Sequence, residues 1–249
     1  MDDFYEQLAP FYHLIYDDWE AAITAQAAML DDIIQSRWGN VRSVLDVSCG
    51  IGTQSIALAA RGYEVTASDL SPANVARAQQ EAEARGLQIP FSVCDMRAAH
   101  NHHGGDFDVV LSAGNSLPHL LSDDDILLAL RQMHACLRPG GGCLITMRQY
   151  DKEARGRGII KPFGVRQEGD RRYLIFQVWD FDDDHYDFAM YFVADDARSD
   201  KATTHVMRSR YYAVSPNHVL QLMAQATFQD VRRLDYGESH PAILVGTKA

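Results

Sequence analysis

Short apolar runs and helical segments alternate along the middle of the chain. Apolar runs of strand length lie at residues 44–47, 64–69, 89–94, 107–111 and 142–147. The segments 53–60, 72–85 and 123–137 carry apolar residues at helical spacing. Strands that alternate with helices build right-handed βαβ units, and such units form a parallel sheet. The pattern therefore predicts a doubly wound, Rossmann-like α/β core over residues 40–150.

The segments outside this core follow different patterns. Residues 4–36 have helical spacing that Pro10 interrupts, which predicts a short helix followed by a longer one. Residues 172–181, 185–194 and 203–214 have the pattern of β-strands, and the acidic stretches 182–184 and 195–200 between them predict turns. A further helix is predicted at 216–226 and a last strand at 242–247.

These patterns predict one α/β domain over residues 1–249, with a mostly parallel sheet of seven strands. N-terminal lid helices at 1–39 and an antiparallel insertion at 160–212 are expected to cover the carboxyl edge of that sheet. This edge is where open α/β sheets bind their ligands.

Composition and charge narrow the class of protein. The chain has 249 residues, 47% of them hydrophobic, so it can bury a core without a metal or a disulfide. Its 23 basic and 34 acidic residues give a net charge of −11, which disfavours a nucleic-acid partner because phosphate contacts need Lys or Arg. The first residues are acidic and no run of about 18 apolar residues occurs, so we expect a cytoplasmic protein without a membrane partner. The oligomeric state stays open.

No cluster in the sequence predicts a metal site. None of the four cysteines belongs to a C-x-x-C pair. His100, His102 and His103 lie in a polar stretch without spaced cysteine or acidic partners. The acidic residues 182–184 lack the later ligand positions of a calcium loop. We expect both clusters to be solvated loops.

A glycine-rich turn after the first core strand carries the main chemical signal. Gly50 and Gly52 stand between a strand and a helix, where the backbone can approach a ligand and free N–H groups can bind it. Asp69 ends the next strand, where an acid can accept both hydroxyls of a ribose. A dinucleotide, S-adenosylmethionine and a helix cap without ligand are the alternatives. Ser55 fits the dinucleotide pattern poorly, and Asp46 would repel a pyrophosphate but favour a sulfonium and an ammonium.

Five stretches of the core occur together: VLDVSCGIGT (44–53), SDLS (68–71), CDMR (94–97), FDVV (107–110) and LRPGG (137–141). As a set they resemble class I S-adenosylmethionine-dependent methyltransferases, over roughly residues 40–150. The sequence departs from that family at Ser48, where Gly or Ala is usual, and serine is small enough to keep the turn. The resemblance implies S-adenosylmethionine as cofactor and S-adenosylhomocysteine as product.

The same resemblance implies which residues hold the cofactor. Asp69 would bind the ribose, and Asp95, with Met96 beside it, would accept the amino group of the adenine. The full implied set is Tyr12, Asp46, Ser48, Gly50, Gly52, Asp69, Leu70, Asp95, Met96, Ala113 and His119.

Three further stretches, GNSLPHL (114–120), RQYD (148–151) and RYY (210–212), look like segments of glycine and sarcosine N-methyltransferases. In that family the arginine after the fifth strand holds the substrate carboxylate, which implies this role for Arg148. The resemblance implies Asn115, Arg148 and Tyr212 as catalytic residues and, together with Tyr16 of the lid, as substrate-binding residues. The expected reaction is N-methylation of glycine, sarcosine or a related amino acid. Methylation of another small molecule at oxygen or carbon, and cofactor binding without catalysis, are the alternatives.

Overall fold

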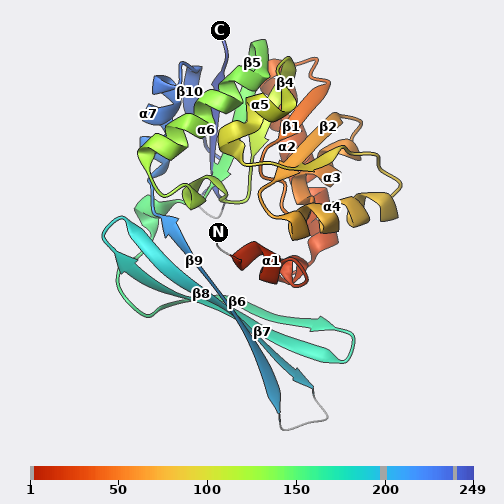
Figure 1. Ribbon diagram of the computed structural model, residues 1–249, viewed down its shortest axis with the longest axis vertical. Helices are drawn as coiled ribbons and strands as arrows, with labels where there is room; N and C mark the ends of the chain where they lie inside the picture. Colours follow the sequence, from red (N-terminus) through yellow and green to blue (C-terminus); the bar gives the residue numbers. More distant parts are fainter. Residues whose placement is uncertain (1–2, 197–200, 238–239) are drawn as a thin grey trace.

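Two β-sheets, one of them covered by helices, make up the structure (Figure 1). The computed structural model describes residues 3–196, 201–237 and 240–249. Most of the turn expected at 195–200 therefore lies outside the described residues. Within the described ranges, no helix combines the length and the apolar composition needed to cross a membrane.

Seven strands form the core sheet: β1 (Ser43–Asp46), β2 (Glu64–Asp69), β3 (Phe91–Val93), β4 (Phe107–Ser112), β5 (Leu137–Met147), β10 (Gln229–Leu234) and β11 (Ala242–Thr247). Their order in the sheet is β10-β11-β5-β4-β1-β2-β3. The first five strands of the chain run parallel, whereas β11 pairs antiparallel with both β5 and β10. This arrangement confirms the predicted doubly wound, mostly parallel seven-stranded sheet.

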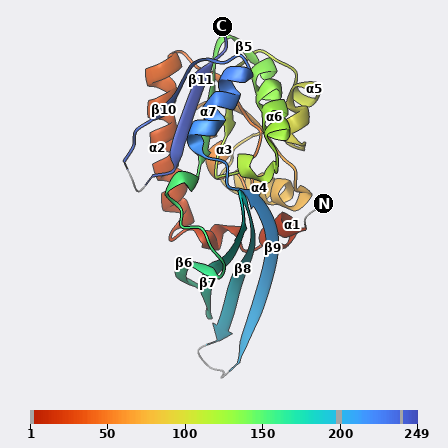
Figure 2. The same ribbon diagram turned by 90° about the vertical axis from the view of Figure 1, so that its left-hand side faces the viewer.

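Helices cover both faces of the core sheet: α2 (Trp19–Trp38), α3 (Thr53–Ala59), α4 (Pro72–Ala84), α5 (Ala99–His103), α6 (Asp123–Cys136) and α7 (Pro216–Gln225). In β5, Leu144 packs with residues of α2 and α3, whereas Cys143 and Ile145 pack with residues of α6 and α7. Successive side chains of a strand point to opposite faces, so each strand contributes to both layers. Figure 2 shows α2 on one side of the sheet and α6 on the other. The histidine-rich loop expected at 100–103 is the last part of α5.

The insertion forms an antiparallel sheet of four strands, in the order β6 (Ile159–Glu168), β7 (Arg171–Asp182), β8 (His185–Asp196) and β9 (Ala202–Tyr212). β6 was not predicted, because it is an edge strand that contains Pro162 and Gly164, with a register shift between them. The inward-facing Trp179 and Tyr186 of this sheet belong to the same buried cluster as Ile145 of the core sheet. The two sheets therefore share one hydrophobic core.

The N-terminal segment lies where the two sheets meet. Its first elements are α1 (Phe4–Leu8) and the 3-10 helix η1 (Tyr12–Ile15), and Figure 1 shows α1 between the core and the four-stranded sheet. Phe4 packs edge-on against Phe188 of β8, with ring centroids 5.1 Å apart. Glu6 accepts a hydrogen bond from the Ser71 hydroxyl at the start of α4. α1 thus contacts both the core and the insertion.

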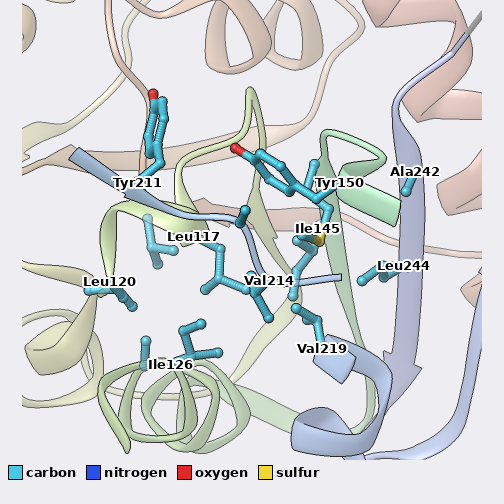
Figure 3. Close-up of a cluster of buried hydrophobic side chains, with 14 of the residues drawn as sticks. Leu117, Leu120, Ile126, Ile145, Tyr150, Tyr211, Val214, Val219, Ala242 and Leu244 are labelled. Carbon is cyan, nitrogen blue, oxygen red and sulfur yellow. The ribbon is translucent and has the colours of Figure 1, made fainter. Parts of the chain in front are cut away.

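An apolar cluster fills the space between α6, α7 and the core sheet (Figure 3). Ile126, Ile145 and Val219 are fully buried in it. Figure 3 also shows that the hydroxyls of Tyr150 and Tyr211 point away from these aliphatic side chains. These tyrosines therefore place polar atoms at the boundary of the apolar core.

Candidate cofactor and acceptor site

The glycine turn between β1 and α3 forms one wall of the candidate cofactor site. Gly50 and Gly52 have φ angles of 54° and 92°, a region that favours glycine. A Cβ at Gly50 would lie 3.3 Å from the ring of Tyr12, and one at Gly52 would lie 3.0 Å from Ile56. The turn therefore requires both glycines, and Tyr12 of the N-terminal segment packs directly against it.

Asp46 lies beneath this turn and is completely buried. Its carboxylate accepts hydrogen bonds from the Ser48 amide at 3.2 Å and from the Ser55 hydroxyl at 2.7 Å. Burial raises the pKa of Asp46 to about 7, although both hydrogen bonds oppose the rise. Asp46 lines neither of the two cavities described below. The structure shows Asp46 holding the turn, and its influence on a bound cofactor stays a prediction.

Asp69 ends β2 and faces the glycine turn. Its Oδ2 accepts a hydrogen bond from the Gly50 amide at 2.8 Å, and its Oδ1 accepts bonds from the Ser71 amide at 3.0 Å and Asn74 Nδ2 at 3.2 Å. Burial raises the pKa of Asp69 against these hydrogen bonds. A carboxylate has about four acceptor positions, so the protein already uses three of them. Binding of two ribose hydroxyls at once would therefore displace one of these bonds.

A first cavity of about 360 Å³ extends from the glycine turn past the ends of β2 and β3. Asp69 and Asp95 supply its acidic groups, and Leu70 and Met96 line it with apolar atoms. Burial alone would raise the pKa of Asp95, but hydrogen bonds from Arg97 outweigh this and hold the pKa below its usual value. An acid beside a glycine turn, followed by apolar walls next to a second acid, fits the adenosine part of S-adenosylmethionine.

His119 and Tyr5 close the first cavity toward the insertion. The Tyr5 hydroxyl hydrogen-bonds to His119 Nε2 at 2.7 Å, and the His119 ring packs edge-on against Tyr211 with centroids 4.1 Å apart. Burial lowers the pKa of His119 to about 3, so the imidazole is neutral near pH 7. Tyr5 was not predicted as a site residue, and the run of aromatic residues in the N-terminal segment was the available signal for it.

A second, larger cavity of about 800 Å³ lies at the ends of β4 and β5. It combines parts of the chain that are far apart in the sequence: the N-terminal segment, the start of α3, both strand ends and the segment before β11. Its wall includes Tyr16, Gln26, Gln54, Asn115, Arg148, Glu153, Tyr236 and His240. The structure therefore places Tyr16, Asn115 and Arg148 in the wall of one cavity, and their role in substrate binding stays a prediction.

Asn115 connects the ends of β4 and β5. Its Oδ1 accepts a hydrogen bond from the Arg148 amide at 2.9 Å, and its Nδ2 donates to the Tyr150 hydroxyl at 2.9 Å. Its φ of 69° lies in the left-handed region, which asparagine adopts more readily than most residues. An amide group has two donors and two acceptor positions. Because the side chain of Asn115 also interacts with the Tyr211 hydroxyl, one acceptor position is left for a ligand.

Arg148 follows β5 and lines the second cavity. Its guanidinium carbon lies 4.6 Å from the ring centroid of Trp179, and its Nη1 is 3.6 Å from Oε1 of Glu153. Its side chain is 31% exposed, so the planar fork of donors can reach a ligand in the cavity. The sequence predicted Arg148 but neither Trp179 nor Glu153, because no motif contains these two residues.

Tyr212, expected as a catalytic and substrate-binding residue, lines neither cavity, and neither does Tyr211, so the role of Tyr212 stays a prediction. Its hydroxyl donates to Asp123 at 3.0 Å, and its ring stacks on His185. Neighbouring residues of a strand point to opposite faces, and in β9 it is Tyr211 that packs against His119. Of these two tyrosines, Tyr211 is therefore the one that lies beside the first cavity, through its contact with His119.

The remaining predicted residues are placed as follows. Ser48 lines the first cavity, and its hydroxyl hydrogen-bonds to that of Ser112 at 3.0 Å. Ala113 follows β4 and is buried without lining either cavity. His103 of α5 contacts the Ser68 hydroxyl, and burial lowers its pKa to about 4. Among the residues that the structure describes, no group of His, Cys, Asp and Glu side chains could hold a metal ion.

Comparison with known proteins agrees with this geometry. Residues 44–141 match the family model described as a methyltransferase domain. The glycine/sarcosine N-methyltransferase of Parasynechococcus marenigrum is 33% identical over 144 residues, which are 58% of this chain and 50% of that protein. The chain thus spans about half the length of the curated relatives it matches.

Two solved structures share the whole fold. DesVI of Streptomyces venezuelae superposes with a TM-score of 0.81 at 20% identity, covering 99% of this chain and 98% of DesVI. An amino pentose methyltransferase of Micromonospora echinaspora, solved with S-adenosylmethionine bound, gives 0.78 at 19% identity, covering 91% of this chain and 92% of that one.

Residues 44–141 thus match a methyltransferase domain, and the fold of the chain is shared with solved methyltransferases, which agrees with the class and the cofactor expected from the sequence. Within this class, the chain is similar in sequence to glycine/sarcosine N-methyltransferases.

Proposed function

We propose that the protein transfers the methyl group of S-adenosylmethionine to the nitrogen of a small amine that carries a carboxylate, with glycine and sarcosine as the first candidates. The observation that carries this proposal is the position of Arg148, whose guanidinium lines the second cavity beside Asn115 at the carboxyl edge of the sheet. Arginine can bind a carboxylate through two parallel hydrogen bonds. The named relatives with this activity support the proposal.

The cofactor supplies the activated methyl group, so the protein needs to provide binding, orientation and exclusion of water. Asp69 and Asp95 hold the adenosine part, between the apolar side chains of Leu70 and Met96. Tyr12 packs on the glycine turn and shields it from solvent. In this assignment the N-terminal segment acts as a lid over the cofactor.

On the acceptor side, the remaining acceptor position of the Asn115 amide orients the amine while Arg148 holds the carboxylate. The amine attacks only in its unprotonated form, because a protonated nitrogen has no lone pair. Tyr5 and the neutral His119 line the first cavity, and they place no positive charge there that would resist a cationic cofactor. These two residues therefore give the cofactor cavity a polar wall without positive charge.

A larger amine, such as an amino sugar, is the second candidate. The volume of about 800 Å³ falls within the range of roughly 300–1,000 Å³ that is typical of sites for drug-sized ligands. The structural relative described as an amino pentose methyltransferase supports the same candidate. An acceptor of this kind would use the polar walls of the cavity and would not depend on Arg148.

The proposal is tested by measuring the release of S-adenosylhomocysteine by the purified protein with glycine, sarcosine, dimethylglycine or an amino-sugar nucleotide. Turnover with an amino acid supports the first candidate, and turnover with the amino sugar alone supports the second. Turnover only with acceptors methylated at oxygen or carbon would replace both. Cofactor binding without turnover on any acceptor would favour a non-catalytic binding protein.

A further inference from the structure

Three charged side chains gather around the buried ring of Trp179 at the wall of the second cavity. Trp179 lies on β7 and has no exposed surface. The guanidinium carbon of Arg148 is 4.6 Å from its ring centroid, and Nζ of Lys161 is 4.9 Å from it. Glu153, which follows η4 (Tyr150–Lys152), contacts both cations. The aromatic ring thus supports two positive charges, which is favourable for its electron-rich face.

Glu153 is bound unequally by the two cations. Its Oε2 accepts a hydrogen bond from Lys161 Nζ at 2.5 Å. Its Oε1 lies 3.6 Å from Arg148 Nη1, which is beyond the usual length of a hydrogen bond. Lys161 therefore holds the carboxylate of Glu153, whereas Arg148 makes only a long electrostatic contact with it.

Because Glu153 binds Lys161 more closely than Arg148, the positive charge of Arg148 stays available to a ligand in the cavity. Two cations and one anion leave a net positive charge at the place where an acceptor carboxylate would bind. Without Lys161, Glu153 would pair with Arg148 and compete with the acceptor for the same donors. The side chains of Lys161, Glu153 and Arg148 are only 29%, 18% and 31% exposed, so solvent screens this competition less than it would on an open surface.

We infer that Lys161 is a specificity-determining residue: by binding Glu153 it keeps Arg148 available for the carboxylate of the acceptor. Lys161 acts through Glu153 and is therefore a positioning residue. The inference rests on the proposed function and extends it, because it assigns the selection of carboxylated amines to the Lys161–Glu153 pair on β6 and after η4. Acceptors without a carboxylate gain nothing from this pair.

The experiment measures kcat and KM for sarcosine at saturating S-adenosylmethionine, together with the inhibition constant of acetate as a carboxylate without an amine. Lys161→Met removes the charge and keeps an apolar side chain on Trp179. We expect it to raise both the KM and the inhibition constant about tenfold, because charge-assisted hydrogen bonds to Arg148 are lost, while kcat stays nearly the same. Lys161→Arg should retain values close to the wild type.

The double variant Lys161→Met/Glu153→Gln distinguishes electrostatic competition from a change of shape. Glutamine has no charge with which to occupy Arg148, so the double variant should regain most of the affinity for sarcosine and acetate. Failure of this rescue, or an unchanged KM in Lys161→Met, would overturn the inference and leave the proposed function intact. A wild-type protein that methylates no amino acid would instead overturn the proposed function, and the inference with it.

Arg172→Met serves as the matched control. Arg172 lies on the same antiparallel sheet and forms an exposed ion pair with Asp195, away from both cavities. Its replacement also removes one positive charge from the sheet, and it should leave KM and kcat for sarcosine unchanged. Thermal unfolding of each variant, monitored by circular dichroism, verifies that the proteins compared are folded.

Discussion

The carboxylate of Asp69 accepts hydrogen bonds from the Gly50 amide, the Ser71 amide and the Asn74 side chain. Two of these donors belong to the backbone, at the glycine turn and at the start of α4. Asp69 therefore fixes the turn and the end of β2 relative to each other, and it also lines the first cavity. Asp69 thus has a structural role and, in the proposed function, also binds the ribose of the cofactor, and replacements of Asp69 test the second role.

We expect Asp69→Ala to weaken the binding of S-adenosylmethionine at least about tenfold, since a charged hydrogen bond contributes about 1.5–3 kcal/mol. Asp69→Asn keeps the shape of the side chain and should lower the affinity less. Calorimetric titration gives the dissociation constants. Asp124→Ala, which removes an exposed acid from the first turn of α6, is the control. A dissociation constant for Asp69→Ala within a factor of about two of the wild type would contradict the ribose assignment.

Replacement of Arg148 should weaken the binding of the acceptor and leave the binding of the cofactor unchanged. We expect Arg148→Ala to raise the KM for a carboxylated acceptor tenfold or more, because the bidentate ion pair is lost, with little change in the affinity for S-adenosylmethionine. Arg148→Lys should recover only part of the loss, since an ammonium lacks the planar fork. Steady-state kinetics measures both. Nearly intact activity of Arg148→Ala would favour an acceptor without a carboxylate.

Residues within sequence motifs could be predicted, and residues brought in by tertiary structure could not. Asn115 and Arg148 follow adjacent strands, so their shared position followed from the topology of a parallel sheet. The sequence could not show which of Tyr211 and Tyr212 points toward the site, because the orientation of a strand's two faces depends on what packs against them. Glu153 and Lys161 lie in segments without a motif, and only the fold shows that they meet.

At the scale of elements, β6 holds the N-terminal segment in place. Arg166 of β6 donates to the carbonyl oxygens of Tyr16 at 2.6 Å and Phe163 at 2.8 Å, and it pairs with Asp17 at 2.5 Å. Its side chain is 11% exposed. His13 forms a second link to this strand through Glu168. Since Tyr12 and Tyr16 belong to the segment held in this way, β6 positions residues of both cavities.

Weakening the contacts between Arg166 and the N-terminal segment should weaken cofactor binding. Arg166→Met removes the hydrogen bonds to Tyr16 and the ion pair with Asp17, and we expect it to raise the dissociation constant of S-adenosylmethionine roughly tenfold. Calorimetric titration measures the effect, and Arg208→Met, an exposed position on β9, is the control. Unchanged cofactor affinity, even with a lower melting temperature, would show that the link is structural only.

Strands of the core were predictable because buried parallel strands read as continuous apolar runs. β10 escaped prediction because it is an edge strand rich in polar residues, with Arg232 and Arg233 in its middle. β5 begins at Leu137, earlier than the predicted 142, since its glycines gave no strand signal. Segments whose side chains mostly face solvent lack the regular spacing of hydrophobic residues from which strands and helices are predicted.

At the scale of the whole molecule, the core sheet and the insertion share one buried cluster, which also includes Phe4 and Leu8 of α1. His119 lies at this junction. Burial lowers the pKa of His119 to about 3, whereas an unfolded chain has a histidine pKa of about 6.5. Between these values the unfolded chain binds more protons than the folded protein, so the free energy of unfolding falls as the pH drops through this window.

We expect His119 alone to lower the free energy of unfolding by roughly 1.4 kcal/mol for each pH unit between about pH 6 and pH 4. Urea unfolding of the cofactor-free protein at several pH values gives the slope. His119→Asn removes the titrating group and retains a polar partner for Tyr5, so its slope should be smaller by about this amount. Identical slopes in the two proteins would contradict a neutral, buried His119.

Methyl transfer to the nitrogen of a small carboxylated amine can be tested in a single labelling experiment. The most direct test is incubation with S-adenosylmethionine carrying a ¹³C-labelled methyl group and a mixture of glycine, sarcosine, N-methylethanolamine and an amino sugar. Nuclear magnetic resonance then identifies the atom that receives the label, because methyl groups on nitrogen, oxygen and carbon differ in chemical shift. We expect a labelled N-methyl group on glycine or sarcosine. Label on oxygen or carbon, or only on an amine without a carboxylate, would contradict it.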